Sequence, residues 1–334
     1  MPNNPVSLWE LSDLCTPWCV HVAATLRVAE QIEAGHHSVD ALAAACACDA
    51  RYLGLMLRHL VRKGVFEEPA PDTFALNDAA REFLDPGAHL GFDLDGLGGR
   101  MAHAWGTLLK AVRTGKPAYA DVFGRGFWDD LEAHQEIAAA FDALMGPEGH
   151  GAPDPDVLLD ADWSGIRSVV DVGGGTGSML AEILRTHPDV RGTLVDQPNT
   201  VARASSTFAK AGVVARAGVV GQSFFDPLPA GADLYLLLKV VSNWTGHELV
   251  AILRRCGEAA GETGRIVIIG GVSADNRPQA LTIETVLIGG MNHGLSEFRT
   301  IAADAGLTVT DAGTQASARF IVECRSAGAG GARP

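Results

Sequence analysis

In this 334-residue chain, the stretch whose residue types are best suited to binding a ligand is a glycine-rich segment, 173–177, that follows a carboxylate. Asp171 lies near the end of the β-branched apolar run 168–172, and an apolar helix pattern follows the glycines. Gly173, Gly175 and Gly177 lack Cβ atoms, so the backbone can turn sharply there and approach a ligand closely. A strand, a glycine turn and a helix predict the start of a doubly wound α/β domain, in which ligands bind at the carboxyl ends of the strands.

Two phosphate-binding patterns do not fit this turn. The dinucleotide pattern needs Gly or Ala where Ser178 stands, and a Walker loop needs a Lys that the turn lacks. An acidic residue followed by three alternate glycines resembles the first motif of class I S-adenosylmethionine (SAM) methyltransferases. Asp196 closes the next apolar run, 192–195, and a carboxylate there can accept both ribose hydroxyls. The alternative is a glycine-rich turn with a solvated aspartate beyond it.

Bulk composition limits the classes of partner and the number of domains. The length predicts two domains, and 47% hydrophobic with 20% charged residues is typical of a globular protein. A net charge of −14 argues against a nucleic-acid partner, since that affinity comes largely from neutralised phosphates. We expect no membrane span, because no apolar run reaches about 18 residues. The N-terminus lacks a signal-peptide pattern, which predicts a cytoplasmic protein.

The cysteines do not match a zinc pattern by their spacing. Cys15 and Cys19 are placed to share one helix face, but no neighbouring Cys or His pair completes a set of ligands. We therefore predict no metal cofactor and buried, reduced thiols. The six cysteines are Cys15, Cys19, Cys46, Cys48, Cys256 and Cys324.

Residues 1–90 carry the pattern of a winged helix. Apolar residues recur at helical spacing over 7–34, and two shorter helices follow at 39–45 and 52–63. Two short β-rich runs, 65–68 and 73–76, then flank a Pro-rich turn and predict a hairpin.

The winged helix has two readings, DNA binding and dimerisation. Basic residues on or beside its third helix favour DNA binding: Arg51, Arg58, Arg62 and Lys63. The same helix is too apolar for a solvated recognition face, since it also carries Leu53, Leu55, Met56, Leu57, Leu60 and Val61. With the acidic charge of the chain, this composition favours a dimerisation domain over a nucleic-acid-binding one.

The segment 91–150 reads as helical, with linker composition near its end at 146–153. Its aromatic and Met residues are each as suited to a core as to a ligand, but together they are able to wall a flat substrate pocket. With one residue from a late loop, the predicted substrate-binding set is Trp105, Phe127, Phe141, Met145 and Met291.

Residues 151–326 predict the cofactor domain, and the Gly/Ala-rich stretch 327–334 a flexible tail. Strand patterns alternate with helical ones, which predicts a mostly parallel, Rossmann-like sheet. The expected strands are 168–172, 192–196, a third at 213–214 or 219–220, then 232–238, 265–269, 307–309 and 318–324.

Three further segments carry a family resemblance. Residues 221–229 resemble a G-G-D-[FM]-F-x-x-x-P segment, and 243–256 resemble H-D-W followed by I-L-R-R-C. Residues 115–119 with 127–128 resemble T-G-x-P-A-[FY] and F-W. Together they are similar to the caffeate-type O-methyltransferase family, in the bacterial branch that methylates polyketide aromatics such as naphthoates, anthraquinones and anthracyclines. The resemblance runs from Leu8 to about Cys324.

The resemblance implies a homodimer whose N-terminal helices complete the partner's active site. It also implies that Ser223 and Phe224 lie along adenine, although the family usually has Asp where Ser223 stands. From the motif and the resemblance together, the predicted SAM-binding residues are Asp171, Gly173, Gly175, Asp196, Ser223, Phe224 and Lys239.

The chain departs from the family at the catalytic base. The family's His-Asp-Trp is replaced by Ser242-Asn243-Trp244, and a serine hydroxyl is no base near neutral pH. We predict a phenol O-methyltransferase that relies mainly on proximity, with Asn243 orienting the hydroxyl. His293 and Glu284 are alternative bases, although the favoured interpretation is a solvated loop histidine and a surface glutamate. Two other functions stay open: a SAM-retaining hydroxylase, decarboxylase or cyclase, and a winged-helix ligand-sensing regulator.

Overall fold

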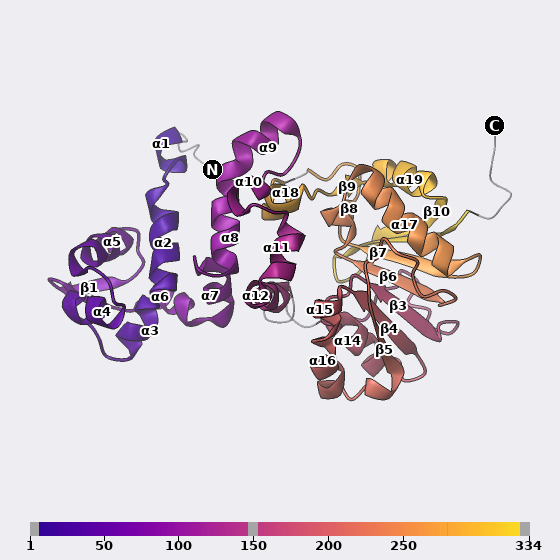
Figure 1. Ribbon diagram of the computed structural model, residues 1–334, viewed down its shortest axis with the longest axis horizontal. Helices are drawn as coiled ribbons and strands as arrows, with labels where there is room; N and C mark the ends of the chain where they lie inside the picture. The colour runs from indigo at the N-terminus through magenta and orange to yellow at the C-terminus, as the bar shows by residue number, and fades with distance from the viewer. Residues whose placement is uncertain (1–6, 146–152, 279, 328–334) are drawn as a thin grey trace. The chain divides into compact units, whose positions relative to one another are not determined.

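The computed structural model describes residues 7–145, 153–278 and 280–327. The chain forms two compact units (Figure 1). The N-terminal unit comprises Met1–His103 with Ala139–Gly149, and the C-terminal unit comprises Ala104–Ala138 with His150–Pro334. The predicted helical segment 91–150 is thus divided between the units. Most of the predicted linker and tail lies outside the described residues, so both stay predictions.

The N-terminal unit is a helical domain with a small hairpin. Leu53, Leu57 and Leu60 lie on one face of α5, and all three are at most 3% exposed. Ser38 and Asp49 cap α4 and α5, since each side chain accepts a hydrogen bond from a backbone N–H of the first turn. The elements are α1 (Leu8–Leu11), α2 (Cys15–Thr25), α3 (Val28–Glu33), α4 (Val39–Ala45), α5 (Ala50–Arg62), β1 (Glu67–Ala70), β2 (Thr73–Ala75), α6 (Asp78–Arg81), α7 (Pro86–Phe92) and α8 (Leu97–Ala104), which ends at the first residue of the other unit.

The strands of the hairpin differ from their predicted bounds, and the contacts of the hairpin argue against DNA binding. Strand β1 starts two residues later than expected and includes Pro69, because the turn tightens around Asp72, which has a φ of +59°. Asp72 also pairs with Arg58 of α5 at 2.6 Å, and Glu68 lies 3.8 Å from the same guanidinium. Because two carboxylates already neutralise the charge of this guanidinium, it would bind a phosphate more weakly than a free arginine does.

The C-terminal unit is built on a seven-stranded sheet in the order β10-β11-β7-β6-β3-β4-β5. Strands β3 to β7 pair in parallel, and β11 joins β7 antiparallel. The sheet strands are β3 (Ser168–Val172), β4 (Arg191–Asp196), β5 (Ala217–Gly221), β6 (Leu234–Leu238), β7 (Arg265–Ile269), β10 (Leu307–Thr314) and β11 (Phe320–Ser326). The doubly wound fold predicted from the sequence is confirmed. For the third strand, only the 219–220 alternative is right, because 214–216 form a 3-10 turn.

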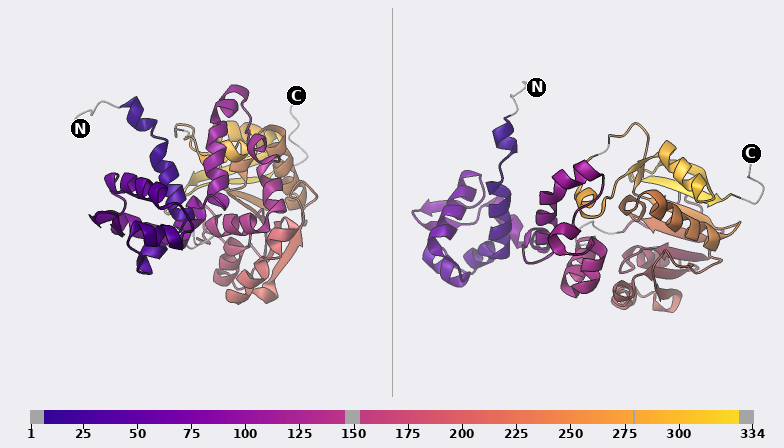
Figure 2. Two further views of the ribbon diagram at one scale, coloured as in Figure 1. Left: turned by 60° about the vertical axis from the view of Figure 1, so that its left-hand side comes forward. Right: turned by 45° about the horizontal axis from the view of Figure 1, so that its top comes forward.

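Side chains alternate between two hydrophobic layers along each central strand. Val170 and Leu237 face one cluster, with residues of α17 (Gly246–Ala260) and α19 (Leu295–Asp304). Val169 and Leu236 face the other, with residues of α14 (Ser178–Thr186) and α16 (Ala204–Lys210). Burial on both faces is the reason that these strands are continuous apolar runs. Figures 1 and 2 show the two helical layers on opposite faces of the sheet.

The structure describes further helices and strands, of which α17, with 15 residues, is the longest. They are α9 (Leu108–Thr114), α10 (Ala120–Phe123), α11 (Phe127–Ala133), α12 (Gln135–Met145), α14 (Ser178–Thr186), α15 (Pro198–Val201), α16 (Ala204–Lys210), α17 (Gly246–Ala260), β8 (Val272–Ser273), α18 (Ile283–Ile288), β9 (His293–Gly294) and α19 (Leu295–Asp304). In the part of the chain that the structure describes, no helix is long and apolar enough to cross a membrane.

A buried ion pair ties β7 to the antiparallel edge. Arg265 lies 2.6 Å from Glu323, whose other oxygen accepts a hydrogen bond from the backbone of Leu159 at 2.9 Å. Asp160 approaches the same guanidinium at 3.2 Å, but its side chain is 54% exposed, against 8% for Glu323.

We expect Glu323→Gln to lower the free energy of unfolding by about 2 kcal/mol, because it removes a charge-assisted bond from a largely buried guanidinium. Asp160→Asn is the matched control and should cost less than about 1 kcal/mol, since that carboxylate faces solvent. Urea denaturation measures both values. Equal costs for the two variants would contradict the role given to the buried pair.

Candidate functional site

The glycine turn packs tightly at the carboxyl end of β3. Gly173 has a φ of +70°, and its N–H donates to the carbonyl of Val195 at 2.8 Å. A Cβ on Gly173 would lie 2.8 Å from Val240 and 3.5 Å from the ring of Phe224. The turn therefore lies close to both the end of β6 and the segment after β5.

Gly174 has a role that the alternate-glycine pattern did not assign. A Cβ at this position would overlap the carboxylate of Asp171 and approach Leu194 at 2.6 Å. No side chain fits there without moving the carboxylate. The requirement comes from a contact across the turn, so spacing alone did not reveal it.

The carboxyl group of Asp171 is buried without any group that would stabilise its negative charge among the described residues. It is 0% exposed, and neither carboxylate oxygen has a hydrogen-bond partner among the described residues. Burial, and then the neighbouring charge of Asp196, raise the pKa of Asp171 to about 7. A carboxyl group left without compensation in this way is stabilised by a cation and destabilised by a phosphate.

Asp196 is held at the end of β4 by backbone donors. One oxygen accepts from the N–H of Gly175 at 2.8 Å, and the other from the N–H of Gln197 at 2.7 Å. Burial raises the pKa of Asp196, and these two N–H groups oppose that shift. Each carboxylate oxygen keeps a lone pair, so the group remains able to accept hydroxyl donors such as those of a ribose.

Rings gather beside the turn. Phe224 meets Trp244 edge to face, with centroids 5.7 Å apart, and Phe225 meets the same indole at 5.1 Å. The Ser223 hydroxyl accepts from the backbone N–H of Phe225 at 3.2 Å, which fixes the start of this segment. The sequence motif alone assigned no role to Trp244. Its ring contact with Phe224 makes it a further candidate site residue.

Ser242 and Asn243 lie in a tight loop after β6. Lys239 has a φ of +57°, and its carbonyl accepts from the Asn243 amide at 3.2 Å and from the Ser242 hydroxyl at 3.4 Å. The Asn243 amide nitrogen is thus turned toward the backbone. Burial lowers the pKa of Lys239, an effect that the carboxylate of Glu284 opposes.

Gly271, which follows β7, and Gly290, which follows α18, allow these two segments to pack closely against Ser242. A Cβ on Gly271 would overlap the backbone of Ser242, and a Cβ on Gly290 would meet both the Ser242 carbonyl and Glu284. The structure therefore brings Glu284 and the loop after α18 to the position where the family has its histidine. Neither glycine had been singled out, because their role depends on contacts between distant segments.

His293 is buried in β9 and is 2% exposed, so its reading as a solvated loop residue is wrong. Its Nδ1 lies 3.1 Å from Glu297, without the alignment of a hydrogen bond. Its backbone N–H donates to the carbonyl of Gly271 at 2.8 Å, and Gly271 is the glycine that packs against the backbone of Ser242. A catalytic role for His293 stays a prediction.

The predicted substrate-binding residues are distributed over both units. Trp105 and Met291 belong to the C-terminal unit and are 40% and 49% exposed. Phe127 also belongs there, but it is 3% exposed and packs edge to face on Tyr119 at 5.5 Å. Phe141 and Met145 belong to the N-terminal unit. Their common role as a substrate wall stays a prediction.

The residues present fit SAM. Three features suit a ligand with cationic groups and a ribose: a buried carboxylate without a hydrogen-bond partner among the described residues, a turn with no room for a Cβ at Gly173, Gly174 or Gly177, and a second carboxylate at the next strand end. Fold and site together define a SAM-dependent methyltransferase of the Rossmann-like class.

Comparison with known proteins identifies the family. The O-methyltransferase domain family matches residues 105–308, and the O-methyltransferase dimerisation domain family matches residues 9–86. The chain belongs to the O-methyltransferase family, as its sequence resemblance had predicted, and it is an enzyme that uses SAM.

Two curated relatives and one solved structure are similar over nearly the whole chain. One relative is 2,7-dihydroxy-5-methyl-1-naphthoate 7-O-methyltransferase of Streptomyces carzinostaticus, 38% identical over 91% of this chain and 93% of the relative. Another is aclacinomycin 10-hydroxylase RdmB of Streptomyces purpurascens, 35% identical over 93% and 86%. The structure is an O-methyltransferase (NcsB1) from neocarzinostatin biosynthesis with SAM and 2-hydroxy-5-methyl naphthoic acid, with a TM-score of 0.87 and 36% identity over 97% and 99%.

We expect Gly174→Ala to weaken SAM binding at least about tenfold, or about 1.4 kcal/mol, because the new methyl displaces the Asp171 carboxylate. Gly165→Ala is the matched control, since a Cβ there meets no atom within 4 Å. Isothermal titration calorimetry with SAM measures both affinities. An unchanged affinity in a folded Gly174→Ala protein would contradict this view of the turn.

Asp171 also predicts a pH dependence of stability. Its folded pKa of about 7 lies above its ordinary value of 3.8, so between these values the folded state holds a proton that the unfolded state has lost. The free energy of unfolding of the ligand-free protein should therefore fall as pH rises through this window, by at most about 1.4 kcal/mol per pH unit. Asp171→Asn should remove this slope. Urea denaturation of both proteins across the window tests it, and identical slopes would contradict it.

Proposed function

We propose that this enzyme methylates a phenolic hydroxyl of a polycyclic, polyketide-type aromatic. The observation that carries the proposal is the 38% identity, over 91% of the chain, to an enzyme named for a dihydroxynaphthoate. A similar solved structure holds a hydroxynaphthoic acid beside SAM. Within the C-terminal unit, Trp105, Phe127 and Met291 are the proposed wall of the substrate site.

The cofactor is held in this proposal by residues at four strand ends. Asp171 faces the cationic portion, Asp196 accepts the ribose hydroxyls, and Phe224 lies along adenine. Gly173 and Gly175 allow the backbone to approach, while Ser223 and Lys239 complete the set. Bound SAM supplies an electrophilic methyl group on a sulfonium.

The protein's own contribution to the chemical step is mainly positioning. A phenol with a pKa of about 10 is ionised in roughly one molecule in a thousand at neutral pH, which costs about 4 kcal/mol. Holding the reacting atoms in line supplies about 7–11 kcal/mol. The step therefore does not need a dedicated base, and a phenol acidified by a neighbouring carbonyl needs even less help.

Asn243 orients the substrate hydroxyl in this mechanism. Its amide nitrogen donates to the Lys239 carbonyl, which leaves the amide oxygen as the group able to accept a hydrogen bond. The phenol proton passes to solvent. Ser242 bonds to the same carbonyl and takes no proton, and His293 and Glu284 are the alternative acceptors.

We further propose that the enzyme acts as a homodimer. The match to a dimerisation domain at residues 9–86 supports this. So does an apolar N-terminal surface, where Leu8, Trp9, Leu11 and Leu14 are each more than 70% exposed. Apolar side chains this exposed are typical of a surface that another chain covers.

A product assay tests the function directly. The full-length protein is incubated with SAM and a panel of hydroxynaphthoic acids and hydroxyanthraquinones, and the products are identified by mass spectrometry. We expect a product heavier by one methyl group and an equal amount of S-adenosylhomocysteine. No methylated product across the panel would contradict the proposal.

A second candidate function is supported by the similarity to a hydroxylase and by Ser242-Asn243 in place of the histidine pair. In that case SAM stays intact as a fixed positive charge. A modified aromatic without stoichiometric S-adenosylhomocysteine would favour this alternative over methyl transfer.

The role of Ser242 is tested by Ser242→Ala. If positioning carries the reaction, kcat/KM should change by less than about threefold, whereas loss of a general base typically costs about 10²–10⁴-fold. Asn243→Ala is the comparison variant, and we expect it to lower kcat/KM more than Ser242→Ala. A loss of about 100-fold or more in Ser242→Ala would contradict the mechanism.

A further inference from the structure

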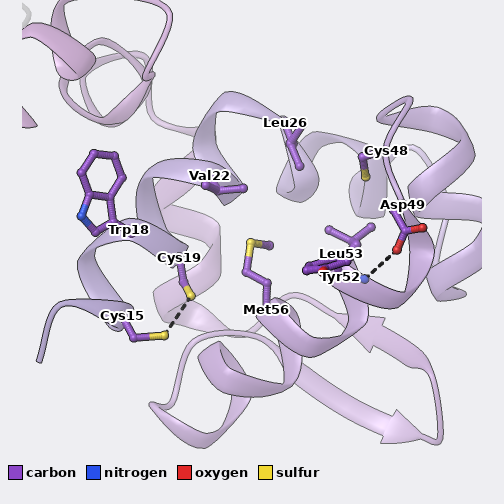
Figure 3. A pocket seen from close by; sticks show the side chains of 10 residues that line it. All are labelled: Cys15, Trp18, Cys19, Val22, Leu26, Cys48, Asp49, Tyr52, Leu53 and Met56. Atoms are coloured by element: carbon purple, nitrogen blue, oxygen red, sulfur yellow. Dashed lines mark hydrogen bonds between the residues drawn. The ribbon is translucent and has the colours of Figure 1, made fainter. Parts of the chain in front are cut away.

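Two thiols and an imidazole converge in the N-terminal unit, outside the methyltransferase site. Cys15 and Cys19 lie one turn apart on α2, and their sulfurs are 3.8 Å apart (Figure 3). His59 comes from α5, and one of its ring nitrogens lies within 4.8 Å of both sulfurs. The sequence spacing did not reveal this set, because the histidine is brought in by the packing of a distant helix.

The separation of the sulfurs matches a tetrahedral site. Two sulfurs about 2.3 Å from a zinc ion at a tetrahedral angle lie about 3.8 Å from each other, which is the separation found here. A zinc-bound nitrogen at about 2.0–2.1 Å would lie about 3.6 Å from each sulfur. Since the His59 nitrogen is already within 4.8 Å, a shift of about 1 Å completes the geometry. A disulfide would need the sulfurs about 1.8 Å closer than they are.

The imidazole is fixed by a chain of polar groups. Nε2 of His59 lies 2.8 Å from the Thr16 hydroxyl, which in turn donates to Asp13 at 2.6 Å. Asp13 also pairs with Lys63 at 3.0 Å, next to the end of α5. Partners of this kind orient a metal-ligating histidine and reduce the entropy lost when the ion binds.

The surroundings allow an ion to enter. Cys15 is exposed, while Cys19 and His59 are half-buried. The two cysteines line the edge of an apolar groove of about 400 Å³, together with Trp18, Val22 and Met56 (Figure 3). An ion held here has water on one side and a largely apolar wall on the other.

We propose that Cys15, Cys19 and His59 bind one Zn²⁺ ion, with water as the fourth ligand. Thiolate and imidazole ligands in this number favour zinc among the common divalent ions. On binding, the two thiols release their protons to solvent and two Zn–S bonds form, so no oxidant or reductant is required. The ion links α2 to α5 and takes no part in methyl transfer.

The test uses the full-length protein without a histidine tag, reduced and freed of metal by chelation. Equilibrium dialysis with Zn²⁺ alone should give one bound ion per chain, and Co²⁺ in its place should give a thiolate-to-cobalt charge-transfer band. Zinc should also raise the melting temperature, because it binds only the folded arrangement.

The chain offers a matched control pair. Cys15→Ser with Cys19→Ser should abolish the bound equivalent and the charge-transfer band. Cys46→Ser with Cys48→Ser should keep both, since those thiols lie in the same unit but outside the cluster. Thr16→Val should weaken zinc binding about tenfold while leaving the stoichiometry intact. An unchanged far-UV circular dichroism spectrum of each variant shows that its helical N-terminal unit is folded.

Three results would overturn the proposal. They are failure of the reduced wild-type protein to bind a stoichiometric ion, equal binding by the two double variants, and a disulfide that forms readily between Cys15 and Cys19 in a protein that takes up no zinc when reduced.

Discussion

The structure of the cofactor site depends on a carboxylate that the protein itself leaves uncompensated. Asp171 is buried behind the glycine turn with no donor for either oxygen among the described residues, and burial, followed by the charge of Asp196, raises its pKa. Burying a charge without a partner costs free energy. A cationic ligand beside Asp171 would lower this cost. In the proposed cofactor site, selectivity for a sulfonium cofactor over a phosphate-bearing one follows from charge, before any shape is considered.

The same constraint explains the close packing around the turn. Gly174 must lack a side chain because the Asp171 carboxylate fills that space, and Gly173 because Val240 does. Val240 in turn begins the loop that carries Ser242 and Asn243. The glycine turn therefore packs directly against the start of the Ser242-Asn243 loop, and the proposed mechanism, which relies on alignment, needs a contact of this kind.

Much of the fold followed from the sequence, because its signals are local. Continuous apolar runs such as 265–269 predicted strands buried on both faces, and Ser38 and Asp49 predicted helix starts. Where local signals were weak, the prediction was ambiguous, as for 213–214, or shifted, as for the hairpin at Pro69. The residues predicted to bind the cofactor lie at strand ends that the same patterns locate.

Contacts between distant segments were beyond the reach of the sequence. The approach of Gly271 and Gly290 to Ser242, the burial of His293 and the meeting of His59 with Cys15 all depend on tertiary packing. Cys15 was expected to be buried and is exposed, because it is the first residue of α2, whose buried residues Ala23 and Ala24 lie near the other end of the helix. Neither the periodicity nor the spacing of residues in the sequence predicts such tertiary contacts.

The central claim is that the carboxylates behind the glycine turn select a cationic sulfur donor and reject phosphate. Calorimetric titration of the same ligand-free protein with SAM and with a nicotinamide dinucleotide tests it most directly. Saturable binding of SAM, with no heat from the dinucleotide and no competition by it, is the predicted result. Binding of the dinucleotide, with SAM leaving the protein unchanged, would contradict it.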